Sequence, residues 1–456
     1  MKLKQKSKFI LILLVIVCSI YTQEVDKNTL VLTSFKESQG AKCNDGSPYG
    51  VYYAPGSGNG IKKVIINIWA GGWCNQRTKE EVLYRCIGRL RSYLGSSRYW
   101  KEKEINKDHG YLSGDPIKNR LFHNYHRFDF PYCDSAGNQG FASNPEIIFG
   151  TDIFFRGYQN TREAINFLRR KIDFLEIDTI VITGCSSAAL ATLHWIQYIS
   201  DLAKEINPKI EVFGISNGGF FIDHINLITN DNDFRIKLQT LFNMVNKESS
   251  IPLKECVEEN KDNPLNCMFP EIFLKYVKPP VLLLQSLYDR WQIDEILGEK
   301  CISNSTMTNC DINQKKNIDN FRIYTKEKIF RMQNLKKNLS IWSPSCIIHC
   351  FNDEDRNSPN WQVPEDSGNT VDNVVERFLN SRGNEQIILI DEVEWPFNKK
   401  CSNYDPNSVL KYEISGNVKT SNLKNETYIQ NGLLYLKIDI IYAYIYIFIM
   451  ILLSFN

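Results

Sequence analysis

The sequence predicts an α/β protein, with a mostly parallel sheet, helices on both faces and one helical insertion. Short apolar runs rich in β-branched residues are typical of strands that are buried on both faces. These runs are Val64–Trp69, Glu146–Phe149, Thr179–Thr183, Ile210–Ile215, Val281–Leu287 and Gln386–Ile390. Apolar residues recur at helical spacing from Asn160 to Phe174 and from Ser187 to Ile206. Strands that alternate with helices indicate a parallel sheet.

The stretch from Ile225 to Lys278 breaks this alternation. It contains a patterned segment, Phe234–Val245, followed by two cysteines. We expect residues 225–278 to form a helical insertion above the sheet that serves as a lid. No internal repeat or long low-complexity linker divides the chain, so residues 23–405 are predicted to form one catalytic domain.

Charge and cysteine usage narrow the class of protein. The formal net charge is +2, so no concentrated basic field favours nucleic acid as a partner. Residues 1–22 are predicted to be a cleaved signal peptide, because a lysine-rich start precedes the nine apolar residues Phe9–Val17. Cys18 leaves with this leader, so twelve of the thirteen cysteines remain, an even number typical of disulfides in an exported chain.

The simplest disulfides are local. They join Cys74 to Cys86, Cys256 to Cys267 and Cys301 to Cys310, while the remaining connectivity stays open. Three glycosylation sequons begin at Asn304, Asn338 and Asn425 and agree with export. Cys346, His349 and Cys350 are closely spaced, but no second ligand pair lies nearby, so we predict no metal and no cofactor.

The C-terminus predicts a membrane tether. A polar spacer, residues 406–439, precedes a hydrophobic tail, residues 440–456, in which Ile440 to Phe455 carry no charge. Small residues, a polar spacer and a terminal apolar tail together are typical of a glycolipid-anchor signal. A short membrane-spanning tail is the alternative, and a buried core segment is a third. We expect the mature chain on the extracellular side, held at the outer membrane surface.

The chemistry centres on Gly184-Cys185-Ser186-Ser187-Ala188. A strand-like run leads into this segment and a helical pattern follows it, which is the layout of the nucleophile elbow in α/β-hydrolase-like enzymes. The pattern Gly-x-Ser-x-Gly departs only at its last position, Ala188. An ordinary strand-to-helix turn with a capping serine is the competing interpretation.

Histidine is scarce, with only six residues: His109, His123, His126, His194, His224 and His349. In this fold the order along the chain is serine, acid, histidine, which removes the three before Ser186. His194 lies on the helix that follows Ser186, too far along it to reach back to the serine. His224 comes so soon after Ser186 that no loop carrying the acid fits between the two. His349 remains as the base, although position alone also allows a polar residue in a disulfide-tied loop.

The acid should follow a strand between Ser186 and His349. Asp289 follows the apolar run that begins at Val281, and Asp223 is its competitor. Gly71 and Gly72 follow the first clear strand and suit a loop whose backbone N–H groups bind an oxyanion, with Ser187 N–H as partner.

Six ordered segments carry a family resemblance. They are Gly71-Gly72-Trp73-Cys74-Asn75, Pro131-Tyr132-Cys133-Asp134, Phe155-Arg156-Gly157, Gly184-Cys185-Ser186, Tyr288-Asp289-Arg290-Trp291-Gln292-Ile293 and Ser345-Cys346-Ile347-Ile348-His349-Cys350. Over roughly residues 30–402 the chain resembles the pectin acetylesterase/Notum family of extracellular carboxylesterases. The resemblance implies the triad Ser186, Asp289 and His349, with an oxyanion hole at the backbone of Gly72, Trp73 and Ser187.

The resemblance implies a secreted serine carboxylesterase that removes O-acetyl groups from a polysaccharide such as pectin. One alternative is a Notum-like deacylase that removes a fatty acyl group from a signalling protein. Another is a catalytically silent binding protein on the same fold. The expected partner is an ester-bearing carbohydrate or a lipidated substrate. The sequence departs from the family at Ser187, Ala188 and Ala189, which are bulkier than the family's small residues, and at Ala70.

Overall fold

A computed structural model describes residues 29–38, 40–105, 110–246, 251–351, 361–364, 366–395 and 401. The predicted leader, the polar spacer and the apolar tail lie outside these residues, and so do His109 and the sequon at Asn425. No helix of the described part of the chain combines the length and the hydropathy that crossing a bilayer requires.

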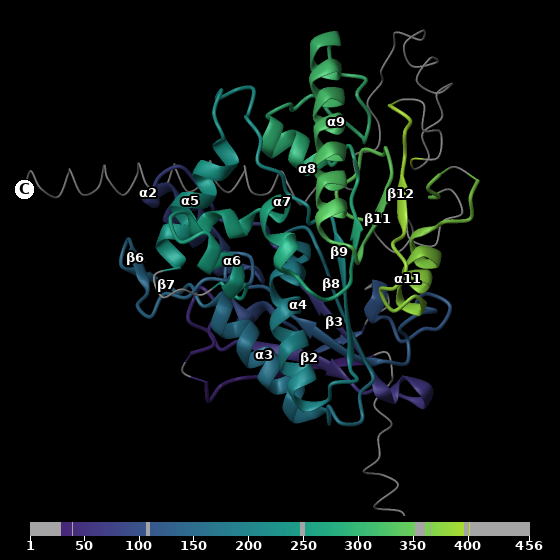
Figure 1. Cartoon of the computed structure of the whole chain (residues 1–456). Coiled ribbons are helices and arrows are strands. Elements are labelled where there is room, and N and C mark those ends of the chain that lie inside the picture. Colours follow the sequence, from purple (N-terminus) through teal and green to yellow (C-terminus); the bar gives the residue numbers. More distant parts are fainter. Residues whose placement is uncertain are drawn as a thin grey trace, which may run out of the picture. The chain divides into compact units, whose positions relative to one another are not determined.

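The main structural element is a ten-stranded sheet with the order β12-β11-β10-β9-β8-β3-β5-β2-β1-β4 (Figure 1). Its strands are β1 (Thr29–Ser34), β2 (Gly50–Ala54), β3 (Lys63–Ile68), β4 (Lys103–Ile105), β5 (His126–Phe130), β8 (Thr179–Cys185), β9 (Glu211–Asn217), β10 (Val281–Leu284), β11 (Leu339–Ser343) and β12 (Ile388–Ile390). Pairing is parallel from β12 to β5. It is antiparallel from β5 through β2 and β1 to β4.

The helices are longest where they connect parallel strands. They are α2 (Lys79–Ile87), α3 (Gly157–Lys171), α4 (Ser187–Ile206), α5 (Asp233–Val245), α6 (Lys254–Glu259), α7 (Pro270–Phe273), α8 (Arg290–Gln292), α9 (Ile312–Leu335) and α11 (Val371–Asn380). Several short 3-10 turns complete the connections. Helix α9 begins with a capping box, in which Asp311 accepts the N–H groups of Asn313 and Gln314.

Helices cover both faces of the sheet, because neighbouring residues of β9 meet different helices. The ring of Phe213 packs on Phe378 of α11, with centroids 5.7 Å apart. Gly214 points the other way, and a Cβ built there would lie 2.8 Å from Ile196 of α4. Helix α3 packs beside α4 through Tyr158 and Trp195, whose ring centroids are 5.2 Å apart. The predicted two-faced parallel arrangement is therefore confirmed.

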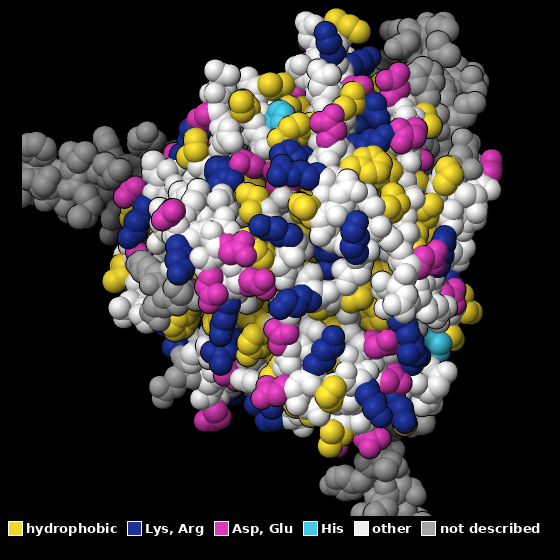
Figure 2. All heavy atoms as spheres, in the orientation of Figure 1, with side chains coloured by type: hydrophobic (Ala, Val, Ile, Leu, Met, Phe, Trp, Pro, Cys, Tyr) yellow, Lys and Arg dark blue, Asp and Glu magenta, His cyan; other side chains and the backbone are white. Residues whose placement is uncertain are grey.

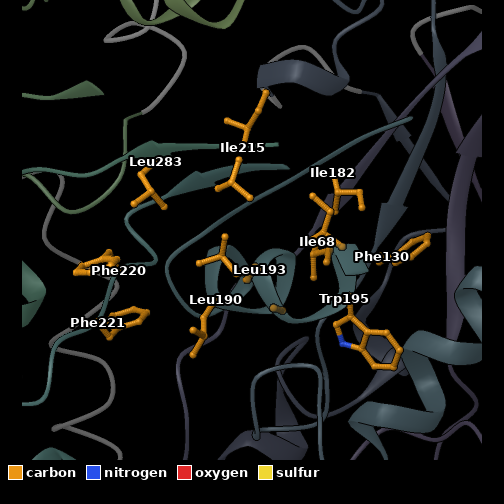
Figure 3. Close-up of a cluster of buried hydrophobic side chains, with 14 of the residues drawn as sticks. Ile68, Phe130, Ile182, Leu190, Leu193, Trp195, Ile215, Phe220, Phe221 and Leu283 are labelled. Carbon is orange, nitrogen blue, oxygen red and sulfur yellow. The ribbon is translucent and has the colours of Figure 1, made fainter. Parts of the chain in front are cut away.

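The core lies between the sheet and these helices. Leu190, Leu193 and Trp195 of α4 are buried in it, as are Ile182 of β8 and Leu283 of β10 (Figure 3). Burial on both faces explains why these strands have continuous apolar runs rather than an alternating pattern. On the surface seen in Figure 2, Lys and Arg are interspersed with Asp and Glu, and neither sign covers a face.

Five of the six apolar runs contain strands of the main sheet. The prediction of a buried parallel strand at Glu146–Phe149 is wrong. Strand β6 (Glu146–Ile148) instead pairs antiparallel with β7 (Thr151–Ile153) in a separate hairpin. Ile147 is 66% exposed and Phe149 is 82% exposed, so this run is apolar without being buried. The sequence does not predict the antiparallel strands β1, β2 and β4, the parallel strand β11, or β5, which pairs parallel with β3 and antiparallel with β2.

The insertion between β9 and β10 is mostly helical. It contains α5, α6 and α7, and α5 coincides closely with the patterned segment Phe234–Val245. Arg77, which follows the glycine-rich loop, ties α5 to the body of the molecule. Its guanidinium meets the carboxylates of Asp231 and Asp233, each at 2.7 Å.

Six disulfides pair all twelve of the expected cysteines. The three local pairs, Cys74–Cys86, Cys256–Cys267 and Cys301–Cys310, are confirmed. The other three, Cys43–Cys133, Cys185–Cys350 and Cys346–Cys401, join residues that are 55 to 165 positions apart. Such a framework is typical of a chain that folds in the secretory pathway.

Candidate active site

The candidate nucleophile, Ser186, sits at the sharp turn between β8 and α4. Its backbone has φ 58° and ψ −128°, a conformation that a residue with a side chain rarely adopts. The turn is tight because strand and helix are in contact. A Cβ on Gly184 would lie 2.7 Å from the carbonyl oxygen of Ala188, so only glycine is accommodated there. The backbone at Ser186 thus has the sharp strand-to-helix turn that the predicted nucleophile elbow requires.

Ser186, His349 and Asp289 lie in hydrogen-bonded series. Nε2 of His349 is 2.7 Å from Oγ of Ser186. Nδ1 of His349 is 2.9 Å from Oδ1 and 3.0 Å from Oδ2 of Asp289. An ionised carboxylate can only accept, so Nδ1 carries the imidazole proton and Nε2 is left to accept from the serine hydroxyl. This tautomer is the one that a general base requires.

Asp289 is held in place by two glutamines. It caps α8 by accepting the N–H of Gln292 at 3.1 Å, and its other oxygen accepts from Nε2 of Gln285 at 2.8 Å. Both glutamines also bond the backbone of the segment that follows β9, at Phe220 and Ile222. Asp289 is only 1% exposed, and its orientation is therefore fixed on several sides.

The competing carboxylate, Asp223, lies elsewhere. Its side chain accepts from Arg235 Nε at 2.7 Å and from Asn232 at 3.0 Å, and not from His349. The other histidines that follow Ser186 are also engaged away from it. His194 is fully buried against the carbonyl of Cys267 at 2.8 Å, and burial lowers its pKa to about 4. His224 contacts Phe321 and Tyr324.

A disulfide connects the two ends of this series. Cys185 directly precedes the serine and Cys350 directly follows the histidine, and the two sulfurs are bonded. Asn217, at the end of β9, adds two hydrogen bonds to the backbone of Phe351 at 3.0 Å. The histidine loop is thus fastened to the neighbouring strand ends. Cys346 is bonded to Cys401, so neither cysteine beside His349 is a free thiol.

The glycine-rich loop after β3 lies against the start of α4. Tyr132 packs on Gly71 so closely that a Cβ on this glycine would lie 2.1 Å from the tyrosine ring. The Tyr132 hydroxyl donates to the carbonyl of Gly72 at 2.6 Å, and Gly72 has a φ of +61°. Arg89 donates to the carbonyl of Trp73 at 3.0 Å. With these carbonyls held, the loop's N–H groups turn toward α4.

The hydroxyl of Ser187 receives two of those N–H groups. Gly71 N lies 3.2 Å and Gly72 N lies 2.9 Å from Ser187 Oγ. Among the described residues the N–H of Trp73 has no acceptor, and the N–H of Ser187 is the first of its helix, which leaves it without an intrahelical partner. Trp73 and Ser187 therefore present free donors beside Ser186, whereas Gly72 N–H bonds a side chain.

A cavity of about 270 Å³ opens beside Ser186. Part of its wall is aromatic, from Trp73, Phe234 and Trp291. These three rings form a cluster with Phe221, and the ring centroids lie 5.1–6.1 Å apart. Trp291 also stacks on the imidazole of His349 at 5.9 Å. The rest of the lining is polar or charged: Asn75, Arg85, Arg89, Lys237 and Glu295.

Comparison with known proteins agrees with this geometry. The model of the pectinacetylesterase family matches residues 21–402. Pectin acetylesterase 5 of Arabidopsis thaliana is 33% identical over 70% of this chain and 73% of its own. The chain belongs to the pectinacetylesterase family. It is accordingly a carboxylic ester hydrolase.

More distant relatives share the same fold. The Notum palmitoleoyl-protein carboxylesterase of Schmidtea mediterranea is 24% identical over 70% of this chain and 57% of its own length. A crystal structure of the Wnt deacylase Notum from Drosophila superimposes with a TM-score of 0.67 at 19% identity, covering 80% of this chain and 97% of that one. The predicted α/β-hydrolase-like class is confirmed.

This pectinacetylesterase accommodates its departures from the family pattern locally. Ala188 is buried, and its methyl group faces Gly184, which has no Cβ to oppose it. Ala189 is accommodated in the same way, since a Cβ on Gly219 would lie 2.6 Å from the Ala189 methyl group. The third departure, Ser187, adds the two hydrogen bonds to the glycine-rich loop.

Several supporting residues escaped sequence reasoning. Tyr132 stood inside a recognised motif, but its hydroxyl bond to Gly72 joins residues 60 positions apart. Gln285 and Gln292 flank Asp289 at four and three residues, a spacing that could have suggested carboxylate-supporting amides. The disulfide between Cys185 and Cys350 had no comparable signal, because nothing in the spacing distinguishes it from other pairs.

We expect Gly71→Ala to lower esterase activity by about a hundredfold or more. The new methyl group would collide with the ring of Tyr132, so the glycine-rich loop must shift away from Ser186. Hydrolysis of p-nitrophenyl acetate measures the effect. Gly88→Ala is the matched control, since Gly88 has φ −61° and no atom within 4 Å of its added Cβ. Equal activity of the two variants would show that the loop's position does not matter.

Proposed function

We propose that the chain removes acetyl groups from a pectin-type polysaccharide, with Ser186 as nucleophile, His349 as base and Asp289 as orienting acid. The observation that carries this proposal is the 2.7 Å contact between Ser186 Oγ and His349 Nε2, on an imidazole held by Asp289 at 2.9 Å. Membership of the pectinacetylesterase family and the 33% identity to a plant pectin acetylesterase support the choice of acetylated pectin as substrate.

The chemistry follows from the positions of these groups. His349 takes the proton of Ser186 as Oγ attacks the ester carbonyl, and Asp289 stabilises the imidazolium that forms. The N–H groups of Trp73 and Ser187 would stabilise the oxyanion, and Gly72 N–H would join them only by leaving Ser187 Oγ. His349 then gives its proton to the sugar oxygen as the ester C–O bond breaks, so that the sugar leaves as a hydroxyl, and water attacks the acetyl-enzyme with the same base taking its proton. No cofactor enters this sequence.

The cavity supports a short acyl group. A long fatty acyl chain requires an apolar channel, because charged groups that line such a channel would lose their hydration without a partner. Arg85, Lys237 and Glu295 line the cavity beside Ser186, and Phe221 and Trp291 of the aromatic cluster pack against His349. This lining favours acetyl ester hydrolysis over the Notum-like removal of a fatty acyl group.

Ser186→Ala should reduce turnover on the order of a million-fold while leaving the fold intact, because the attacking atom is gone and the buried framework is unchanged. Purified variant and wild-type protein are compared on p-nitrophenyl acetate, with circular dichroism as the check on folding. A well-folded variant that keeps near-full rate would rule out Ser186 as the nucleophile, whereas an inactive wild-type protein would favour the silent binding protein.

A series of p-nitrophenyl esters from acetyl to palmitoyl tests the acyl choice with one leaving group throughout. We expect kcat/KM to fall by roughly tenfold or more between acetyl and octanoyl, since each added methylene must enter a charged cavity. Deacetylation of acetylated pectin, followed by released acetate, tests the natural substrate. Faster cleavage of palmitoyl than of acetyl esters would favour the fatty-acyl alternative.

For localisation we propose that the mature enzyme is held at the outer face of a membrane. The proposal rests on the sequence alone: the uncharged run from Ile440 to Phe455 follows a polar spacer, as in glycolipid-anchor signals. A phosphatidylinositol-specific phospholipase added to intact cells should release activity into the medium. Activity freed only by detergent would indicate a spanning tail, and activity already in untreated medium would contradict both forms of tether.

A further inference from the structure

Two arginines that line the cavity beside Ser186 have no carboxylate partner among the described residues. Arg85 lies in the last turn of α2, and Arg89 lies in the 3-10 turn Gly88–Arg91 that follows. Both arginines line the same cavity of about 270 Å³ as the candidate nucleophile. Neither forms an ion pair with any described residue within 4 Å.

The other charges of the cavity are already matched. Lys237 meets the buried carboxylate of Asp233 at 2.6 Å, one turn earlier on α5. Glu295, the acidic residue in the wall, pairs with Lys300 at 3.3 Å. The unmatched charge is therefore positive, and it belongs to the two arginines.

Arg89 and Arg85 differ in how much hydrogen-bonding capacity they have left. Arg89 donates to the carbonyl of Trp73 at 3.0 Å and to the hydroxyl of Tyr132 at 3.4 Å, so its guanidinium is fixed in the loop framework. Arg85 is exposed and makes no hydrogen bond to a described residue. The pKa of Arg85 is lowered by desolvation and then by the positive charge of Arg89, which Glu295 partly offsets.

Arg85 is also held at a defined place relative to the reacting centre. Its neighbour Cys86 is bonded to Cys74, which directly follows the glycine-rich loop. The start of α2 is closed by a capping box between Thr78 and Glu81. A cation on this short, doubly fastened helix keeps its position beside the loop, which is what a binding group needs.

We propose that Arg85, supported by the charge of Arg89, binds the free carboxylate of a uronate sugar in the chain whose acetyl ester lies at Ser186. A guanidinium matches a carboxylate with two parallel hydrogen bonds, and a partly enclosed site strengthens them. The inference rests on the proposed function and makes it more specific: an acidic acetylated polysaccharide is selected over a neutral one, and over one whose carboxylates are methyl-esterified.

Calorimetric titration with trigalacturonic acid and with its neutral trimethyl ester tests the proposal without turnover. Full-length Ser186→Ala protein serves as the background, so that neither ligand is hydrolysed. The acid should bind about tenfold tighter than the ester or better, and its affinity should fall between about 50 and about 500 mM salt. Arg85→Gln should abolish most of this preference and flatten the salt dependence, and Arg85→Lys should restore only part of it.

Arg169→Gln is the matched control. It removes the same charge from an exposed arginine in the last turn of α3. This turn precedes β8, so it lies at the amino-terminal ends of the strands, whereas Ser186 lies at their carboxyl ends. This variant should bind the acid as the background protein does. The proposal is overturned if Arg85→Gln keeps the preference for the acid, or if the background protein shows none. Because binding is read without hydrolysis, failure to deacetylate pectin would count against the proposed function alone.

Discussion

Strand β8 and helix α4 approach each other so closely that the chain can connect them only through a strained residue. Gly184 lies against the backbone of Ala188, and Ser186 adopts φ 58° to make the turn. This strain is maintained because β8 is hydrogen-bonded to β3 on one side and to β9 on the other, and because α4 is buried against the core. The turn places the serine hydroxyl above the carboxyl ends of the strands, where the loops that follow β3, β10 and β11 also begin.

Hydrogen bonds and a disulfide hold those loops at a fixed distance from Ser186. Gln285 and Gln292 fasten Asp289 to the segment after β9. The disulfide between Cys185 and Cys350 connects the serine turn to the histidine loop, and Asn217 adds hydrogen bonds beside it. A hydrogen-bonded series that spans three loops needs this redundancy, since a shift of about 1 Å in any one of them would remove the contact.

The glycine-rich loop shows how one departure from the family pattern is used. Tyr132 and Arg89 bond the carbonyls of Gly72 and Trp73, which turns the N–H groups of the loop toward α4. Ser187 then adds a hydroxyl that accepts from Gly71 and Gly72. The Ser187 side chain thereby fastens the loop and occupies the N–H groups of Gly71 and Gly72, whereas the N–H groups of Trp73 and Ser187 have no acceptor among the described residues.

The sequence by itself predicted five strands of the parallel part of the sheet, β3, β8, β9, β10 and β12, and named the residues of the candidate triad. Strands buried on both faces are continuous apolar runs, and a Gly-x-Ser turn between a strand and a helix is a local pattern that survives in the sequence. The scarcity of histidine left His349 as the only candidate base, and six short motifs distinguished Asp289 from Asp223. The sequence does not predict β5, β11 or the antiparallel strands β1, β2 and β4. It predicts a buried strand where an exposed hairpin begins at Glu146–Ile148, because apolar composition does not report burial.

Only the tertiary structure decided which distant groups meet. The bond between Tyr132 and Gly72, the two donors on Ser187 and the pairing of Cys185 with Cys350 all join residues 60 to 165 positions apart, and no periodicity records such contacts. The same holds for Arg85, which in the sequence is one of 54 lysines and arginines. Its significance comes from the cavity that it shares with Ser186 and from the absence of a carboxylate partner among the described residues. Local propensity acts over a few residues, whereas the packing of the sheet brings the loops that follow β3, β8, β10 and β11 together at the carboxyl ends of the strands.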